Sequence, residues 1–231
     1  MNTDKIQLSL LDKEGVRWAQ ETVTRWHYLH RPMDPRTMPE GYAVYLGGRD
    51  PVGLLLFGRP EATKVNGWYG GVEGVTRGYF EVTRWQVLNL ARVYFVPAVQ
   101  EGGLCFDRVY LPGFVDRRGV WRSTLASSAI RLALGRIGFD YLIKRPPCFL
   151  DEPYEIMWVL SYCDTRLHKG MVYRGSGFEQ FRKNEKGIET WRVRVKGLSG
   201  NQDDCVREAA RVSPRSQRMR VKRAQMTFDW R

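Results

Sequence analysis

The stretch LSYCDTRLHKGMVYRGSGF, residues 160–178, places reactive side chains where an apolar run ends. Asp164 ends the run, His168 comes four residues later, and Tyr173 follows. Ligands collect at the edge of a sheet where strands end. Asp164 is therefore a candidate general base or metal ligand, and the alternative is an aspartate that caps a turn.

His27 and His30 are the only other histidines in the chain and lie near the end of an amphipathic segment. If the fold brings this segment beside the end of the late strand, His27, Asp164 and His168 could hold Fe(II) or another divalent metal. The alternative is that His27 or His168 is a hydrogen-bonded buried histidine or a loop residue. The metal hypothesis requires the His27 imidazole to lie within a few ångströms of the Asp164 carboxylate.

An arginine interrupts an apolar segment that reads as a strand over residues 85–97. Burying the Arg92 side chain without a partner would cost several kcal/mol. It is therefore expected to face either a carboxylate such as Asp164 or an anionic substrate. Tyr173 could stack on a base or donate a proton, and the alternative is that it only packs.

The turn DRRGVWRST, residues 116–124, precedes a segment with helical periodicity. Neither a GxxxxGK[ST] loop nor a GxGxxG fingerprint occurs in the chain. Backbone amides after Gly119, together with the helix dipole, could hold a phosphate or pyrophosphate. Ser123 and Ser127 are candidates for the same cofactor site, or else they are helix caps or packing residues.

The chain carries a formal net charge of +12, which favours attraction to a polyanion and makes nucleic acid the first partner to consider. The C-terminal segment 197–231 is poor in aliphatic residues and has a run of basic residues without an acid. We expect a tail that orders on a partner, or else a docked helix with a solvated basic face. The candidate DNA-binding residues are Arg215, Arg218, Arg220, Lys222 and Arg223.

Composition indicates the number of domains and bears on metal, disulfide and membrane sites. The chain has 231 residues and is 43% hydrophobic, which indicates one domain over residues 1–196 followed by the tail. Its four cysteines form no CxxC pair, so neither a zinc knuckle nor a disulfide framework is indicated. Without an apolar stretch of about 18 residues or a signal pattern, we expect a soluble cytoplasmic protein with no membrane partner.

Hydrophobic periodicity indicates the elements that must position these residues. A helix is expected over residues 11–29, with His27 and Tyr28 in its last turn. A second helix is expected over 122–138, closed by Gly138. The expected strands are a hairpin of 41–48 and 51–58, followed by 85–97, 155–163, 171–178 and 189–197, with a loop over 59–82 that could reach over a site.

Several segments together resemble the Mom family of bacteriophage DNA-modification proteins. They are HYLHR, VGLLLFG, LNLARVYFVP and SYCDTRLHKGMVYRGSGF, and the similarity covers about residues 14–195. The last segment is the most specific. The family pattern of Ser-Tyr-small-Asp, His and Gly, then Tyr and an aromatic corresponds to Ser161, Tyr162, Cys163, Asp164, His168, Gly170, Tyr173 and Phe178.

The resemblance implies an α/β fold like that of GNAT-type acetyltransferases, with a mixed, mostly antiparallel central sheet flanked by helices and splayed open at its centre. It implies conversion of adenine in double-stranded DNA to a carbamoylmethyl-type base that protects phage DNA from host restriction. It also implies iron and acetyl coenzyme A as cofactors. The residues that match the family's activity-linked positions are His27, Tyr28, Arg92, Asp164 and Tyr173.

One motif departs from the acetyltransferase pattern. Of the pyrophosphate signature only Gly119 remains, with Asp116 at the Arg or Gln position and Trp121 in place of a small residue. This departure counts against coenzyme A. Chemistry on a duplex base would require base flipping, with Trp68, Tyr69 or Tyr173 as stacking partners. The alternative functions are an N-acetyltransferase acting on a small amine or a protein, and a non-catalytic DNA-binding module.

Overall fold

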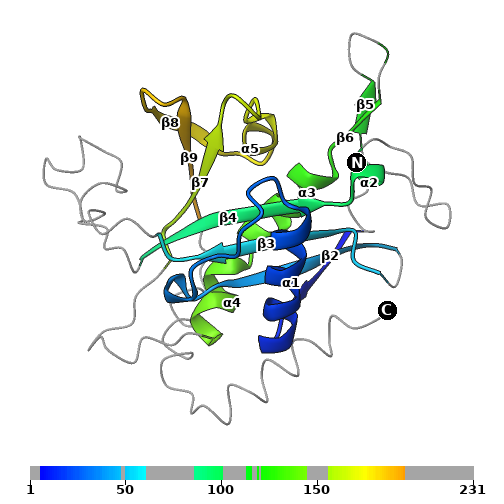
Figure 1. Cartoon of the computed structure of the whole chain (residues 1–231), viewed down its shortest axis with the longest axis vertical. Coiled ribbons are helices and arrows are strands. Elements are labelled where there is room, and N and C mark those ends of the chain that lie inside the picture. Colours follow the sequence, from blue (N-terminus) through cyan, green and yellow to red (C-terminus); the bar gives the residue numbers. More distant parts are fainter. Residues whose placement is uncertain are drawn as a thin grey trace, which may run out of the picture.

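A central sheet organises the computed structural model, which describes residues 6–47, 50–60, 86–100, 113–115, 119, 121–144 and 156–195. The sheet has seven strands in the order β1-β2-β3-β4-β7-β9-β8 (Figure 1). Its strands are β1 (Ile6–Leu10), β2 (Glu40–Leu46), β3 (Gly53–Gly58), β4 (Val87–Phe95), β7 (Trp158–Asp164), β8 (Glu179–Lys183) and β9 (Ile188–Arg194).

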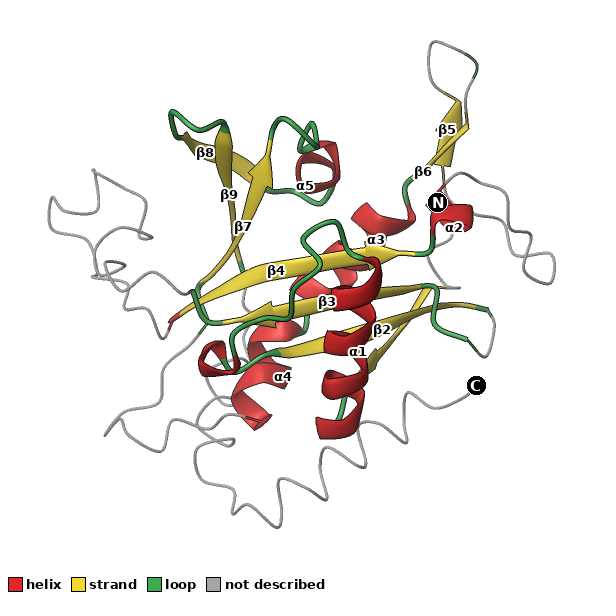
Figure 2. Cartoon of the chain, in the orientation of Figure 1, coloured by secondary structure: helices red, strands yellow, loops and turns green. Residues whose placement is uncertain are grey.

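Helices cover both faces of this sheet (Figure 2). Helix α1 (Lys13–Trp26) lies on one face, and α3 (Leu125–Leu134) and α4 (Ile137–Lys144) lie on the other. The remaining described elements are the 3-10 helix η1 (Pro35–Thr37), the short helices α2 (Pro97–Gln100) and α5 (Met171–Gly175), and a two-stranded sheet of β5 (Gly113–Val115) and β6 (Trp121–Ser123).

All adjacent strands of the large sheet pair antiparallel except β4 and β7. These two run parallel and pair only from Val87 to Asn89 against Trp158 to Leu160. Beyond that point β7 rises away from β4 and continues beside β9 (Figure 1). The predicted fold class is therefore confirmed, including a sheet that splays open at its centre.

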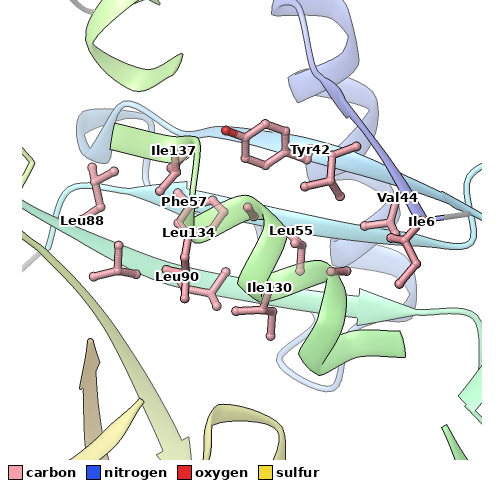
Figure 3. Packing of buried hydrophobic residues seen from close by; sticks show 14 of the residues in the cluster. Ile6, Tyr42, Val44, Leu55, Phe57, Leu88, Leu90, Ile130, Leu134 and Ile137 are labelled. Atoms are coloured by element: carbon pink, nitrogen blue, oxygen red, sulfur yellow. The ribbon is translucent and has the colours of Figure 1, made fainter. Parts of the chain in front are cut away.

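Two apolar layers hold the sheet between its helices. On one face, side chains of the central strands such as Leu55 and Leu90 pack with Ile130 and Ile137 of α3 and α4 (Figure 3). On the other, Ala19 and Val23 of α1 form part of a second cluster. Strand β3 is buried on both faces, which explains its uninterrupted apolar sequence.

Several predicted elements are confirmed, namely the hairpin of β2 and β3 and the strands β4, β7 and β9. The single helix predicted over 122–138 is wrong. The chain forms two helices there because Gly135 ends α3, and Gly138 lies inside α4. The strand predicted over 171–178 is also wrong, since α5 occupies its first half and Phe178 is buried in the core.

The first helix ends earlier than its periodicity predicts. Asp12 caps its N-terminus by accepting a hydrogen bond from the backbone N–H of Gly15 at 2.7 Å. The last helical residue is Trp26, and His27 follows as an extended C-cap residue. The prediction that His27 and Tyr28 lie in the last turn is therefore wrong. Because the chain leaves the helix here, the His27 side chain is buried while Tyr28 stays 40% exposed.

Some predictions fall outside the described residues. They include most of the loop over 59–82 with Trp68 and Tyr69, and the basic tail with its five candidate DNA-binding residues. Among the described helices, none is long and apolar enough to cross a membrane.

Candidate functional site

The segment after α1 meets the segment after β7 beside the splayed centre of the sheet. The Tyr28 ring lies edge-on to the His168 ring with a centroid distance of 4.9 Å, and its centroid is 4.3 Å from that of His27. Two motifs separated by more than a hundred residues in the sequence are thus in contact. The direct contact is made by Tyr28 and His168 rather than by His27 and Asp164.

His27 is a buried neutral histidine. Its Nδ1 accepts a hydrogen bond from the backbone N–H of Leu29 at 3.2 Å. Burial lowers the pKa of His27 to about 4, and electrostatic interaction with Arg92 and His168 lowers it further. At neutral pH the imidazole is therefore uncharged and its hydrogen is on Nε2. It can donate a hydrogen bond from this atom but does not carry a charge.

Arg92 is placed by a bulge in β4, where the register with β3 shifts between Leu56 and Phe57. Arg92 is 8% exposed, and its guanidinium group donates to the carbonyl oxygen of Ala91 at 2.8 Å. It also lies 3.5 Å from the carbonyl oxygens of Arg31 and Pro32. Arg92 therefore holds the loop after α1 in place and puts a positive charge beside His27.

Tyr173 connects α5 to the central strands. Its phenol is hydrogen-bonded to Ser161, whose hydroxyl donates to the Leu90 carbonyl at 2.9 Å. Burial raises the pKa of Tyr173 to about 12, so the phenol stays protonated. Its ring centroid lies 5.7 Å from that of Phe178 and 6.1 Å from that of Trp191. Because the ring already packs, these surroundings favour a hydrogen-bonding role over stacking on a base.

Asp164 organises the turn that follows β7. Its Oδ1 accepts from the backbone N–H of Arg166 at 3.0 Å, and Oδ2 accepts from the Arg166 guanidinium at 2.6 Å. The hydrogen bonds from Arg166 lower the pKa of Asp164 to about 2. A carboxyl group with this pKa is a weak base at neutral pH. The structure therefore favours the turn-capping interpretation, in which Asp164 positions His168.

The residues implied as iron ligands do not fit a metal ion in this arrangement. Within the described ranges, no group of three or more His, Cys, Asp or Glu residues could hold a metal. The Nδ1 of His27 is already an acceptor, and both carboxylate oxygens of Asp164 bind Arg166. The set of His27, Asp164 and His168 is thus corrected from a metal site to a site of hydrogen-bonding and aromatic side chains.

The residues implied for a coenzyme fit a phosphate only in part. Thr124 is the N-cap of α3 but makes no side-chain capping bond, and its buried Oγ1 has no hydrogen-bond partner within the described chain. The first amides of α3 thus lack this cap. The Ser127 hydroxyl, however, donates to the Val172 carbonyl of α5 at 3.3 Å. Gly119 is an exposed residue with φ 75, and the side chain of Ser123 lies outside the described part.

One residue of the matched family pattern, Ser161, was given no role in the sequence analysis. Ser161 links Tyr173 to the backbone of β4 and is 1% exposed. A serine inside the apolar run of a buried strand is the signal that could have identified it, because such a hydroxyl needs a partner. Cys163 behaves as expected of a structural thiol, since it is buried and burial raises its pKa.

No protein-family model matches the chain, and no curated protein matches its sequence. Among solved structures, the chain is similar to a spermidine N-acetyltransferase from Vibrio cholerae at 9% identity and a TM-score of 0.44, covering 86% of this chain and 99% of that one. A complex of the same enzyme with CoA and spermine gives 10% identity, 83% and 96% coverage, and a TM-score of 0.42. The AHL synthase LasI is 11% identical with a TM-score of 0.41, and the match covers 85% of this chain and 92% of that one. Similarity at this level assigns no family, substrate or cofactor to this chain.

Proposed function

We propose that the protein is an enzyme that modifies the exocyclic amine of adenine in double-stranded DNA, adding a carbamoylmethyl-type group as the resemblance implies. The observation that carries this proposal is the contact between Tyr28 and His168. It joins two of the four segments on which the resemblance depends, HYLHR and SYCDTRLHKGMVYRGSGF, at the splayed centre of the sheet.

The side chains gathered there suit a planar, uncharged base. His27 is neutral, with its hydrogen on Nε2, and burial raises the pKa of both Tyr28 and Tyr173. His27 and Tyr28 are thus hydrogen-bond donors at neutral pH, and the ring nitrogens of adenine are acceptors. The Tyr173 hydroxyl donates its hydrogen to Ser161, so toward a substrate this phenol offers an acceptor oxygen. The Arg92 charge favours an anionic group on a co-substrate or a developing negative charge.

The substrate would be reached by extruding the base from the duplex, because the helix stack shields its exocyclic amine. The net charge of +12 supports binding to the phosphate backbone. In this proposal Asp164 is a positioning residue, since its carboxylate holds the turn that presents His168.

The second candidate is an acyl-CoA-dependent N-acetyltransferase that acts on a small amine or a protein. The observation that favours it is the N-terminus of α3, where Thr124 provides no side-chain cap for the first amides. A pyrophosphate could bind such amides. The contact from Ser127 to Val172 counts against it, because α5 packs on the first turn of α3.

Nucleoside mass spectrometry of plasmid DNA from cells that express the protein tests the proposal. We expect a new, heavier deoxyadenosine derivative, absent from cells without the protein. Unmodified deoxyadenosine, with the protein abundant in the soluble fraction, would contradict the proposal. Calorimetric titration with acetyl coenzyme A decides the second candidate. Tight coenzyme binding without affinity for duplex DNA would favour it, and tight DNA binding without any modified base would favour a non-catalytic DNA-binding module.

A further inference from the structure

We propose that Leu167 enters the base stack of the bound duplex and fills the space that an extruded adenine leaves. This inference rests on the proposed function and names a residue that makes extrusion possible. It concerns the turn over residues 164–168, which lies directly beside the candidate site.

The turn is held rigidly by Asp164 at its first position. The Asp164 carbonyl accepts hydrogen bonds from the backbone N–H groups of Leu167 at 3.0 Å and His168 at 2.9 Å. The Asp164 carboxylate binds both the backbone and the guanidinium of Arg166. The backbone at the tip of this turn is therefore already ordered, so inserting a side chain from it costs little backbone entropy.

Leu167 is the apolar tip of the turn. It is 58% exposed, whereas the neighbouring His168 contacts Tyr28. A single exposed leucine needs no explanation by itself. Here, however, it stands one residue from the site and two residues before the exposed Lys169, while the exposed Arg166 on its other side is paired with Asp164. An apolar wedge next to a cation matches a duplex, which presents phosphates beside the stacked bases.

The segment opposite the turn, residues 25–31, also combines an exposed apolar side chain with cations. Trp26 is 59% exposed, Arg25 and Arg31 are exposed, and the segment contains no acidic residue. The Arg25 guanidinium lies 4.9 Å from the centre of the Trp26 ring. In the turn, Asp164 and Arg166 neutralise each other, so Lys169 gives residues 164–169 a net positive charge. Both segments therefore complement the negative charge of DNA.

Insertion would offset the cost of extrusion. Unstacking a base costs a few kcal/mol, and an apolar side chain in the gap restores contacts for the neighbouring bases. Phosphate contacts dominate affinity for DNA, so removing the wedge is expected to reduce extrusion far more than binding.

Duplexes that carry 2-aminopurine at the adenine position, in every nearest-neighbour context, provide the test because their fluorescence rises when the base leaves the stack. We compare the wild-type protein with Leu167→Ala and Leu167→Met. The matched control is Leu132→Ala, a 38% exposed leucine of α3 on the other face of the sheet. Fluorescence anisotropy measures DNA binding in parallel, and thermal melting checks that each variant is folded.

The expected result is a rise in fluorescence with the wild-type protein, Leu167→Met and Leu132→Ala, and loss of most of that rise with Leu167→Ala. DNA affinity of Leu167→Ala should change by less than about threefold. A rise in 2-aminopurine fluorescence with Leu167→Ala as large as with the wild type would overturn the proposal that Leu167 is inserted. So would a wild-type protein that binds the duplexes without any rise in fluorescence. A protein that extrudes the base through Leu167 but leaves deoxyadenosine unmodified supports the wedge and overturns the proposed function.

Discussion

Two polar clusters of this molecule are built on opposite principles. The first, here the anchoring cluster, joins α4 and the preceding turn to strand β2. The second, here the site cluster, lies where the loop after α1 meets the end of β7 and α5. The anchoring cluster comprises Glu40, Tyr42, Arg136, Asp140 and Lys144, and the site cluster comprises His27, Tyr28, Arg92, His168 and Tyr173.

In the anchoring cluster every charge faces an opposite charge. The Tyr42 hydroxyl donates to Asp140 at 2.7 Å, and Arg136 lies 3.2 Å from the same carboxylate. Lys144 lies 2.8 Å from Glu40 and also donates to the Leu11 carbonyl. Burial raises the pKa of Asp140, and both Arg136 and Lys144 oppose that shift. Such closed pairing leaves no charge for a ligand.

The site cluster places neutral side chains around one buried guanidinium group, that of Arg92, instead. Arg92, His168 and His30 all lower the pKa of His27, and the nearby carboxylate of Asp164 is bound by Arg166. The result is a group of neutral donors beside a buried cation. Burial shifts pKa values in both clusters, and a shifted pKa is compatible with a functional or a structural role. The ion pairs of Asp140 and Glu40 are what mark the anchoring cluster as structural. The comparison therefore predicts that substitutions in the first cluster affect stability and those in the second affect activity.

The largest expected effect is on stability, from Asp140→Ala. Its removal leaves Tyr42 and Arg136 without their carboxylate partner, which we expect to lower the free energy of unfolding by about 3 kcal/mol. The matched control is Glu21→Ala, which breaks the ion pair of Arg17 and Glu21 at the same i,i+4 helical spacing. The Arg17 and Glu21 side chains are 84% and 68% exposed. We expect less than about 0.5 kcal/mol from the control in urea denaturation. Equal losses would show that the anchoring cluster has no special role.

Gly170→Ala should destabilise the turn that leads into α5. Gly170 has φ 63, and an added Cβ would lie 2.5 Å from the Trp191 ring. Together, strain and overpacking should cost about 2 to 3 kcal/mol. Gly177→Ala separates the two causes, because Gly177 has φ 92 but nothing within 4 Å of an added Cβ. The Trp191 contact is unimportant if the two variants melt at the same temperature.

His27→Gln should change how stability depends on pH. The pKa of His27 falls from 6.5 in the unfolded chain to about 4 in the folded protein. Between pH 6.5 and 4 the unfolded state thus binds more protons than the folded state. The contribution of His27 to stability is therefore complete above pH 6.5 and is lost as the pH falls toward 4. We expect the wild-type protein to lose about 2 kcal/mol more than His27→Gln over this range. Parallel stability curves for both proteins would contradict the low pKa.

Tyr173→Phe should have the smallest effect on stability. The variant keeps the ring between Phe178 and Trp191 but loses the hydrogen bond with Ser161. The expected loss is about 1 kcal/mol, whereas modification of DNA should fall more steeply if the phenol contacts the substrate. Ser161→Ala is the control, since it removes the same bond and keeps the phenol. Equal activity of the two variants would assign Tyr173 a positioning role.

The sequence allowed the central strands to be predicted because long apolar runs such as GLLLFG have no other stable location. It did not predict β8, whose sequence EQFRK lies exposed at the sheet edge without apolar alternation. It also missed α5, because five residues are too few for a helical period to be recognised.

The candidate site was predicted at the level of segments and not of contacts. The motifs around His27 and Asp164 do lie near each other, but the Asp164 carboxylate is ion-paired with Arg166, two residues further along the chain. Whether this ion pair forms depends on the backbone conformation of the turn after β7. The position of Arg92 likewise depends on a bulge, which shifts the side chains of the strand in a way that alternation alone cannot indicate.

The most direct test of the difference between the clusters is nucleoside mass spectrometry of plasmid DNA from cells that express the wild-type protein, His27→Phe or Tyr42→Phe. We expect a heavier deoxyadenosine derivative with the wild type and with Tyr42→Phe, and its loss with His27→Phe, which keeps a ring but has no donor, despite normal soluble expression. Modification that survives His27→Phe unchanged, or deoxyadenosine that remains unmodified with the wild type, would contradict the assignment of the site cluster.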